Sequence, residues 1–455
     1  MIEKINRTNQ KGKKITIIGL KKSGYAAALL GNQLGATIFV SDFSKDKEII
    51  NNRNILIKKG IDCEIGKHTN KIYDADYWVV SPGVPSDIDI IKKAKKITIP
   101  IIGEIEFASS LTNIPIVAVT GSNGKSTTVS IIHNMLKTKK LSPILAGNIG
   151  IPLSKIILEE IKNPDIGNIL ILEISSFQLE FINQFRPIIS VFLNISPDHL
   201  DRHKSMDEYI KMKLKMITNS KEDDKIVYNE DDDTFRKEFS GRRPNQIPFS
   251  LKNKTQFFNV CETKIYDERN ELICSLDEIL LKGEHNLSNL IASATVARIL
   301  NVDNKTIKNT MKNYSGIDHR LQTIRKLKGV TYINDSKATN VHSVIVATNS
   351  FDNPIILILG GKNKNSDFRL LLPHTKRHVK HIVSYGEAGG EIATAIGDAV
   401  RLNRVSSLRQ AVASAHKLAA PGDIVLMSPG CASFDQFNNF EERGNKFAYL
   451  VNNLD

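Results

Sequence analysis

The sequence predicts an α/β protein built on parallel β-sheets, and three observations lead to this prediction. Short apolar runs recur along the 455 residues, and each ends in glycine or polar residues. Helical patterns of small and apolar residues separate these runs, and this alternation favours parallel strands joined by right-handed crossovers. The chain is also longer than one hydrophobic core usually organises, so we expect several domains.

The first block, residues 1–103, opens with a βαβ unit. The run KKITIIGL predicts a strand, YAAALLGNQLGA a helix and TIFVSD a second strand. A further strand, YWVVS, ends in a turn that begins at Ser81-Pro82-Gly83. The turn after the first strand lacks the middle glycine of a GxGxxG pattern, because Lys21 stands there. A dinucleotide pyrophosphate is therefore not expected to approach this turn closely.

The second block, residues 104–316, contains the most specific motif of the chain. The strand PIVAVT leads into a glycine-rich loop, and the helical pattern KSTTVSIIHNML leaves it. Backbone N–H groups of such a loop surround phosphate oxygens, and the helix N-terminus adds its dipole. The match to GxxxxGK[ST] is incomplete, because Val119 replaces the first glycine. We still expect a phosphate loop made of Thr120, Gly121, Ser122, Asn123, Gly124, Lys125, Ser126 and Thr127.

Two strand ends of the second block carry candidate metal ligands. Glu173 ends the run ILILEISS, and His199 lies in NISPDHLDR, which ends the next run. Mg²⁺ prefers oxygen ligands and keeps several waters, so a small protein shell is expected. A structural cluster of Asp198, His199 and Arg202 beside a turn explains the same local pattern equally well.

The third block, residues 317–455, repeats the pattern of apolar runs followed by polar clusters. It contains VTYINDSKATN, PIILILGG, HIVSYG and DIVLMSPG. In open parallel sheets, ligands bind outside the carboxyl ends of the strands, where these clusters are expected to lie.

Composition and charge exclude several classes of protein. The four cysteines are far apart, which argues against a disulfide framework or a structural zinc site. No apolar run approaches the roughly 20 residues that span a bilayer, and the N-terminal residues contain no apolar leader pattern. The formal charge of +13 comes from scattered lysines without interleaved aromatics, so no nucleic-acid partner is expected.

Seven motifs in a fixed order give the chain a resemblance to a known family. They are TGSNGKST, EISSFQLE, NISPDHLDRH, GEHNLSN, DHR, NDSKATN and SPGCASFDQFNNFEERG. Together they resemble the Mur ligases over nearly the whole chain. NDSKATN and the last motif most resemble the members that join D-glutamate to UDP-N-acetylmuramoyl-L-alanine.

The resemblance implies an ATP-dependent, cytoplasmic and monomeric enzyme of peptidoglycan synthesis with three domains. The N-terminal domain is expected to be Rossmann-like, the central one P-loop ATPase-like and the C-terminal one Rossmann-like. Matching motif positions imply contacts to the UDP substrate from Ser23, Gly24, Asp42 and Asn148. They imply ATP contacts from the phosphate loop and from Asn286, Asn289, Arg320, Asp335 and Lys337. D-glutamate is assigned to Lys364, Ser433 and Phe440.

The family also implies two Mg²⁺ ions and a modified lysine. Ser126, Glu173 and His199 match metal ligands, and Lys125, Lys337 and His199 match catalytic positions. Lys213, four residues after Tyr209, matches a lysine that CO₂ converts to a carbamate ligand. Only the neutral amine reacts with CO₂, and neighbouring cations favour that form. Taken without the family, Lys213 is an ordinary solvated lysine among Lys204, Lys211 and Lys215.

Three rival functions remain open at this point. Another Mur ligase or a folylpolyglutamate synthase shares much of the motif set, and the C-terminal pocket distinguishes it. A nucleotide-binding regulator without catalysis and a nucleic-acid binder are the other two. An ATPase assay with both substrates separates the regulator from an enzyme.

Overall fold

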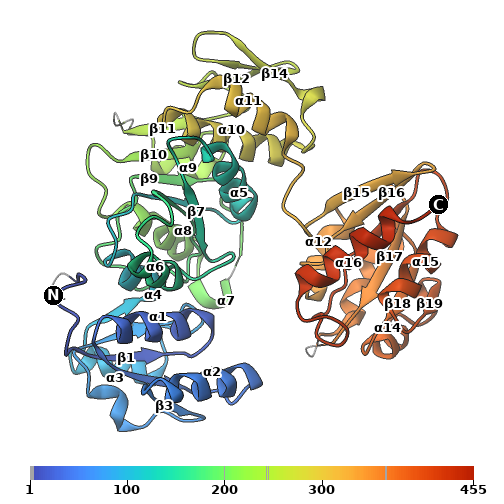
Figure 1. The fold of residues 1–455 in the computed structure, drawn as a ribbon. Helices are drawn as coiled ribbons and strands as arrows, with labels where there is room; N and C mark the ends of the chain where they lie inside the picture. The colour runs from blue at the N-terminus through green and yellow to red at the C-terminus, as the bar shows by residue number, and fades with distance from the viewer. Residues whose placement is uncertain (1–4, 199, 242, 244, 364–365) are drawn as a thin grey trace. The chain divides into compact units, whose positions relative to one another are not determined.

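The computed structural model describes residues 5–198, 200–241, 243, 245–363 and 366–455. Two compact units make up the chain, Met1–Tyr314 and Ser315–Asp455, and each is described by itself. Figure 1 shows the order of their helices and strands.

The first sheet of unit 1 is a five-stranded parallel sheet in the order β3-β2-β1-β4-β5. Its strands are β1 (Lys14–Ile18), β2 (Thr37–Asp42), β3 (Asp62–Ile65), β4 (Tyr77–Val80) and β5 (Ile101–Gly103). The helices α1 (Lys22–Gln33), α2 (Lys47–Lys58) and α3 (Asp89–Lys96) and the 3₁₀ turn η1 (Asn70–Tyr73) connect them. The strand order reverses between β1 and β4, so the turns after these two strands form the expected ligand crevice.

The second sheet of unit 1 is a six-stranded parallel sheet in the order β11-β10-β9-β6-β8-β7. Its strands are β6 (Ile116–Thr120), β7 (Pro143–Gly147), β8 (Ile169–Glu173), β9 (Ile189–Phe192), β10 (Lys225–Asn229) and β11 (Gln246–Phe249). Helices α4 (Glu104–Ser109), α5 (Lys125–Leu136), α6 (Leu153–Lys162), α7 (Leu200–His203), α8 (Met206–Leu214), with η2 (Lys215–Ile217), and α9 (Asp233–Glu238) belong to the same region. The central strands are buried throughout, because helices cover both faces of a parallel sheet.

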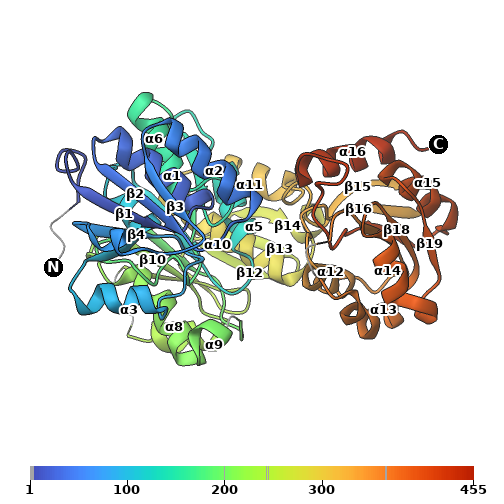
Figure 2. The ribbon, with the colours of Figure 1, turned by 90° about the horizontal axis from the view of Figure 1, so that it is seen from below.

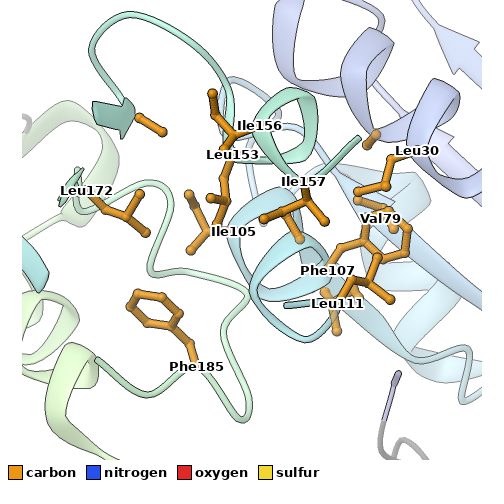
Figure 3. Packing of buried hydrophobic residues seen from close by; sticks show 14 of the residues in the cluster. Leu30, Val79, Ile105, Phe107, Leu111, Leu153, Ile156, Ile157, Leu172 and Phe185 are labelled. Carbon is orange, nitrogen blue, oxygen red and sulfur yellow. The ribbon is translucent and has the colours of Figure 1, made fainter. Parts of the chain in front are cut away.

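One hydrophobic cluster connects the two sheets of unit 1. It includes Leu30 and Val79 from the first sheet region, and Leu172 and Phe185 from the second. Figure 3 shows helices α4 and α6 between them, with Phe107 and Ile157 pointing into the shared core. The first 103 residues therefore share one of their two hydrophobic clusters with the second sheet region, and the smaller cluster around Trp78 is completed by Phe181.

The remainder of unit 1 contains an antiparallel sheet that the apolar patterns did not predict. Strands β12 (Phe258–Cys261), β13 (Lys264–Asp267) and β14 (Leu272–Ser275) form it. The turn η3 (Leu276–Glu278) and the helices α10 (Glu284–Ile299) and α11 (Asn304–Asn313) follow. Helix α10 packs against α5, so it brings its first turns beside the phosphate loop.

Unit 2 contains a six-stranded sheet in the order β15-β16-β20-β17-β18-β19. Its strands are β15 (Gln322–Leu327), β16 (Val330–Asn334), β17 (Ile355–Gly360), β18 (Val379–Tyr385), β19 (Leu402–Arg404) and β20 (Ile424–Met427). Only β15 is antiparallel to its neighbour. The helical segments are α12 (Val341–Thr348), η4 (Phe368–Leu371), α13 (Leu372–His378), α14 (Gly389–Ile396), η5 (Gly397–Ala399), α15 (Leu408–Leu418) and α16 (Phe440–Asn452).

Helices cover both faces of this last sheet, as Figure 2 shows. Val412 of α15 and Phe447 of α16 pack on one face, and Val344 of α12 and Ile392 of α14 pack on the other. The prediction of parallel α/β sheets is confirmed. In the part of the chain that the structure describes, no helix has both the length and the apolar character needed to cross a bilayer.

Candidate active site

The phosphate loop lies between β6 and α5, as the sequence predicts. Gly121 has a φ of +158° and Gly124 a φ of +82°, backbone conformations that glycine adopts without strain. A Cβ on Gly124 would also collide with the side-chain amide of Asn289 from α10. Asn289 is buried and accepts a hydrogen bond from Thr128 Oγ1 at 3.2 Å. The predicted ATP residue Asn289 therefore contacts the loop directly.

Two lysines converge on one carbonyl of this loop. Lys125 Nζ donates to the carbonyl oxygens of Gly121 and Ser122, at 2.8 Å each. Lys213 Nζ, on α8, donates to the same Gly121 oxygen at 2.9 Å. Lys213 is only 1% exposed, so its position is not that of an ordinary solvated surface lysine.

The surroundings of Lys213 favour its neutral amine. Burial, together with the charge of Lys125, lowers the pKa of Lys213 to about 7, although the charge of Asp198 acts in the opposite direction. The Tyr209 ring lies under Nζ, with 4.5 Å between Nζ and the ring centroid. Tyr209 is in turn hydrogen-bonded to Ser122 of the phosphate loop, with 3.2 Å between the hydroxyl oxygens. Lys213 is thus held beside the loop with its pKa near neutrality.

Glu173, at the end of β8, joins the loop to a neighbouring turn. Its carboxylate accepts from Ser126 Oγ at 2.7 Å and from Asn148 Nδ2 at 2.8 Å. The carboxylate of Glu173 and the hydroxyl of Ser126 are oxygen donors of the kind Mg²⁺ prefers, so this pair fits the predicted cation. Within the described residues, no group of three or more His, Cys, Asp and Glu side chains has the arrangement of a metal site.

The loop after β9 is attached to the phosphate loop by several hydrogen bonds. Asn123 N donates to Asn194 Oδ1 at 2.8 Å, and Ser122 Oγ donates to the Ser196 carbonyl at 3.0 Å. His199, the predicted metal ligand that follows, lies outside the described residues. Two other predicted ATP residues, Thr127 and Asn286, lie in the first turns of α5 and α10.

The predicted uridine-nucleotide residues lie at the carboxyl ends of β1 and β2. A Cβ on Gly24 would collide with the carbonyl oxygen of Gly19, so the turn requires glycine there. Ser23 precedes Gly24 in the first turn of α1. Asp42 accepts from the backbone N of Leu20 at 2.6 Å and of Ser44 at 2.7 Å. Asp42 therefore organises the turn through both of its carboxylate oxygens.

In unit 2, the predicted residues gather at the carboxyl ends of β16 and β20. Buried Asp335 accepts from Ser428 Oγ at 2.7 Å and from Leu321 N at 3.2 Å, and burial raises its pKa to about 6. Lys337 N donates to the His319 carbonyl at 2.9 Å. Ser433, Phe440 and Arg320 are buried, half-buried and exposed, in that order. Lys364 lies outside the described residues.

Three side chains in the motifs had no role from sequence reasoning. Tyr209 packs its ring against Lys213 Nζ, as described above. His319 is 8% exposed and forms a T-shaped ring contact with Phe440, with 6.4 Å between ring centroids. Arg443 is fully buried. The motifs YIKMK, DHR and FEERG contain these residues, but a motif does not show which of its side chains is buried.

Family models match along most of the chain. The MurD N-terminal domain matches residues 14–90, the Mur ligase middle domain 119–297, and the Mur ligase, glutamate ligase domain 319–431.

The chain belongs to the Mur ligase family.

The resemblance predicted from the motifs is confirmed, and this Mur ligase has the family's three-domain α/β fold. A Salinibacter ruber protein is 37% identical over 96% of this chain and 97% of its own. An Acidobacterium capsulatum protein is 39% identical over 97% of this chain and 96% of its own. Both are named UDP-N-acetylmuramoylalanine--D-glutamate ligase.

Solved structures of other Mur ligases have the same fold. MurF from Acinetobacter baumannii gives a TM-score of 0.58 at 15% identity, covering 95% of this chain and 93% of its own. UDP-N-acetylmuramate–alanine ligase from Thermotoga maritima gives 0.55 at 17% identity, covering 97% and 99%. At these identities the likeness concerns the fold alone.

Proposed function

We propose that this Mur ligase joins D-glutamate to UDP-N-acetylmuramoyl-L-alanine with ATP, in the cytoplasmic synthesis of peptidoglycan precursors. The observation that carries the proposal is the identity of 36–39%, over nearly full length, to relatives that all have this one ligase name. Half-buried Lys125 and buried Lys213, which converge on the phosphate loop, support it chemically.

The proposed chemistry has two steps. A carboxylate does not react with an amine at neutral pH, because oxide is too poor a leaving group. ATP phosphorylates the carboxylate of the L-alanyl residue, which forms an acyl phosphate and releases ADP. The amine of D-glutamate then attacks the carbonyl carbon, the amide bond forms and phosphate leaves. The first step needs mainly positioning and charge stabilisation.

We assign the phosphoryl transfer to residues around the phosphate loop. Backbone N–H groups of residues 121–127 and the ammonium of Lys125 bind the transferred phosphate. Asn286 and Asn289 contact the nucleotide from α10, and Arg320, Asp335 and Lys337 contribute from unit 2. Ser126 and Glu173 would hold Mg²⁺ together with His199, and a CO₂-derived carbamate on Lys213 would hold a second ion. The cations neutralise phosphate charge when bound.

The two other substrates are assigned to separate turns. Ser23, Gly24, Asp42 and Asn148 are proposed to bind the UDP substrate, and the hydrogen bond from Asn148 to Glu173 supports a link between that substrate and the phosphate loop. Lys364, Ser433 and Phe440 are proposed to bind D-glutamate. His199 is a candidate base for the incoming amine, and we expect the enzyme to be monomeric.

The direct test is phosphate release from ATP with UDP-N-acetylmuramoyl-L-alanine and a panel of amino acids. D-glutamate is expected to support turnover at least tenfold better than L-glutamate, D-aspartate or meso-diaminopimelate, a discrimination of about 1.4 kcal/mol or more. Equal rates with the diamino acid would reject the assignment. ATP binding without turnover on any amino acid would instead favour a nucleotide-binding regulator.

A further inference from the structure

Arg443, in the first turn of α16, is a fully buried cation with three neutral hydrogen-bond acceptors. It is 0% exposed. Its Nε donates to Ser336 Oγ at 2.9 Å, and its Nη2 donates to the Ser336 carbonyl at 2.8 Å. Its Nη1 donates to the Cys431 carbonyl at 3.0 Å. Burying a guanidinium is costly, so three well-placed acceptors indicate a site organised around this side chain.

The guanidinium of Arg443 lies where three loops meet. Ser336 follows β16, Cys431 follows β20, and Gly361 follows β17. Gly361 has a φ of +127°, and a Cβ there would be 3.1 Å from Arg443 Nη1. The order β16-β20-β17 makes these strands direct neighbours in the sheet. One side chain therefore hydrogen-bonds to the loops after β16 and β20 and lies directly against the backbone of the loop after β17, at the edge where parallel sheets bind ligands.

The same three loops contain several of the unit 2 residues assigned above. Asp335 and Lys337 flank Ser336, Ser433 lies two residues after Cys431, and Gly361 begins the glycine turn that leads to residue 364. Ser336 Oγ also donates to the Phe440 carbonyl at 2.7 Å, so Phe440 belongs to the same network.

We propose that Arg443 is a positioning residue that locks the loops after β16, β20 and β17 into the shape that receives the incoming amino acid. The proposal rests on the proposed function for the identity of that amino acid. Arginine is required because its planar guanidinium presents N–H groups in several fixed directions and so donates to Ser336 and Cys431 together, whereas a lysine ammonium lacks this fixed, planar arrangement of donors. The charge of Arg443 also favours the ionised form of Asp335.

Two variants and one matched control test the role. Arg443→Ala removes the guanidinium, and Arg443→Lys keeps a charge without the planar group. Arg325→Ala is the control, because Arg325 Nη1 donates to the Asn452 and Leu454 carbonyls at 3.1 and 2.9 Å, at the far end of the same helix. It removes an anchor of α16 without touching the three loops.

Arg443→Ala is expected to lower kcat/KM for D-glutamate by about 100-fold, because small misplacements of binding groups have effects of that size. The KM for the UDP substrate is expected to change by less than about twofold, since its proposed residues lie in unit 1. Guanidinium chloride at millimolar concentration is expected to restore part of the activity, and tetramethylammonium chloride is not. Arg443→Lys is expected to lower kcat/KM for D-glutamate as well, and Arg325→Ala is expected to change neither this value nor the KM for the UDP substrate.

A second readout does not depend on catalysis. Hydrogen exchange of the Ser336, Gly361 and Cys431 loops is expected to quicken in Arg443→Ala and to remain at the wild-type rate in Arg325→Ala. If the wild-type enzyme does not use D-glutamate, only the proposed function is rejected. The hydrogen exchange of the loops and the KM for the amino acid that the enzyme does use still test the role of Arg443. The positioning role would be overturned if hydrogen exchange of the loops were unchanged in Arg443→Ala. It would also be overturned if the constants for the amino acid and for the UDP substrate changed equally. Failure of both Arg443 variants to fold would overturn it as well, since the residue would then be a general folding determinant.

Discussion

At the residue scale, Lys213 has a buried environment that is unusual for a lysine. The side chain lies between the Tyr209 ring and the Gly121 carbonyl, beside a second lysine that also contacts this carbonyl. Burial and the charge of Lys125 lower its pKa to about 7, so much of it is neutral at neutral pH. Neutrality is the condition for carbamate formation, which supplies the hard anionic ligand that a lysine lacks.

We predict that Lys213→Ala retains less than about a hundredth of wild-type phosphate release, because an anion that orients a cation at the transferred phosphate is lost. Acetate is expected to restore part of the activity by occupying the place of the carbamate. The assay is phosphate release with and without added acetate. Lys211→Ala is the matched control, since Lys211 lies on the same helix but is exposed. Full activity of unassisted Lys213→Ala would show that this lysine is not modified.

Asp335 carries a cost in stability that depends on pH. Burial raises its pKa from 3.8 to about 6 in the folded protein. Between these two values the native state binds more protons than the unfolded state, so stability falls as pH rises through this window. The penalty is complete above pH 6 and absent below the unfolded pKa.

We predict that Asp335→Asn is more stable than wild type at pH 7.5, by on the order of 2 kcal/mol, and gains nothing near pH 4. Asparagine has the shape and the hydrogen-bonding groups to keep the bonds to Leu321 N and Ser428 Oγ. Urea denaturation at the two pH values measures the difference. Phosphate release is expected to be lost in the same variant, because Asp335 is one of the proposed ATP contacts. An equal gain at both pH values would contradict the assigned pKa.

At the scale of elements, helix α4 connects the two sheet regions of unit 1 through hydrogen bonds of a buried carboxylate. Buried Glu106 of this helix accepts hydrogen bonds from the backbone N of Asn183, Gln184 and Phe185, at 2.8 to 2.9 Å. The backbone N of Gly103 donates to the Phe181 carbonyl in the same segment, at 2.8 Å. One carboxylate thus satisfies three backbone donors of a segment that has no regular structure of its own.

We predict that Glu106→Ala lowers the free energy of unfolding by about 3 kcal/mol, because buried backbone N–H groups are left without acceptors. Urea denaturation followed by fluorescence of Trp78, the single tryptophan, measures it; Trp78 packs in the same cluster as Phe181. Glu106→Gln is expected to lose less, since one oxygen remains. Glu159→Ala is the control, because it removes only an exposed i,i+4 pair with Lys155 on α6 and should change stability by less than about 1 kcal/mol. A wild-type midpoint for Glu106→Ala would contradict this anchoring role.

At the scale of the molecule, the two compact units have separate hydrophobic clusters, whereas the first two sequence blocks share one. Every residue of the two hydrophobic clusters of unit 2 lies beyond residue 320. The cluster around Phe107, in contrast, combines residues of both sheets that precede Tyr314. Cooperative folding follows shared apolar burial, so the units are expected to unfold separately and the first two blocks together.

We predict that residues 315–455 expressed alone fold and unfold cooperatively, whereas residues 1–103 expressed alone do not. The first fragment keeps its whole core, and the second loses the partners of Leu30 and Val79. Far-UV circular dichroism and calorimetry during heating measure both. A sharp, cooperative transition in fragment 1–103 would mean that the shared cluster is not needed for its stability.

Much of the fold and part of the candidate site follow from the sequence alone, because they rest on local patterns. Apolar runs with glycine or polar ends predict β1, β6, β8 and β17 and their parallel arrangement, since buried parallel strands consist almost wholly of apolar residues. The phosphate loop is a local motif that needs its own glycines, and its position between β6 and α5 follows directly. Family motifs supply the remaining residue assignments.

Only the tertiary structure decides which of these residues act on one another. The convergence of Lys125 and Lys213 on one carbonyl, the bond from Asn148 to Glu173 and the burial of Arg443 between three loops each join residues distant in sequence. Burial and the approach of charges set the pKa of Lys213 and Asp335, and neither is encoded by the neighbouring residues of a motif. The sequence thus determines which chemical groups stand at the strand ends, and the packing of the sheets and helices determines their partners, charge state and exposure.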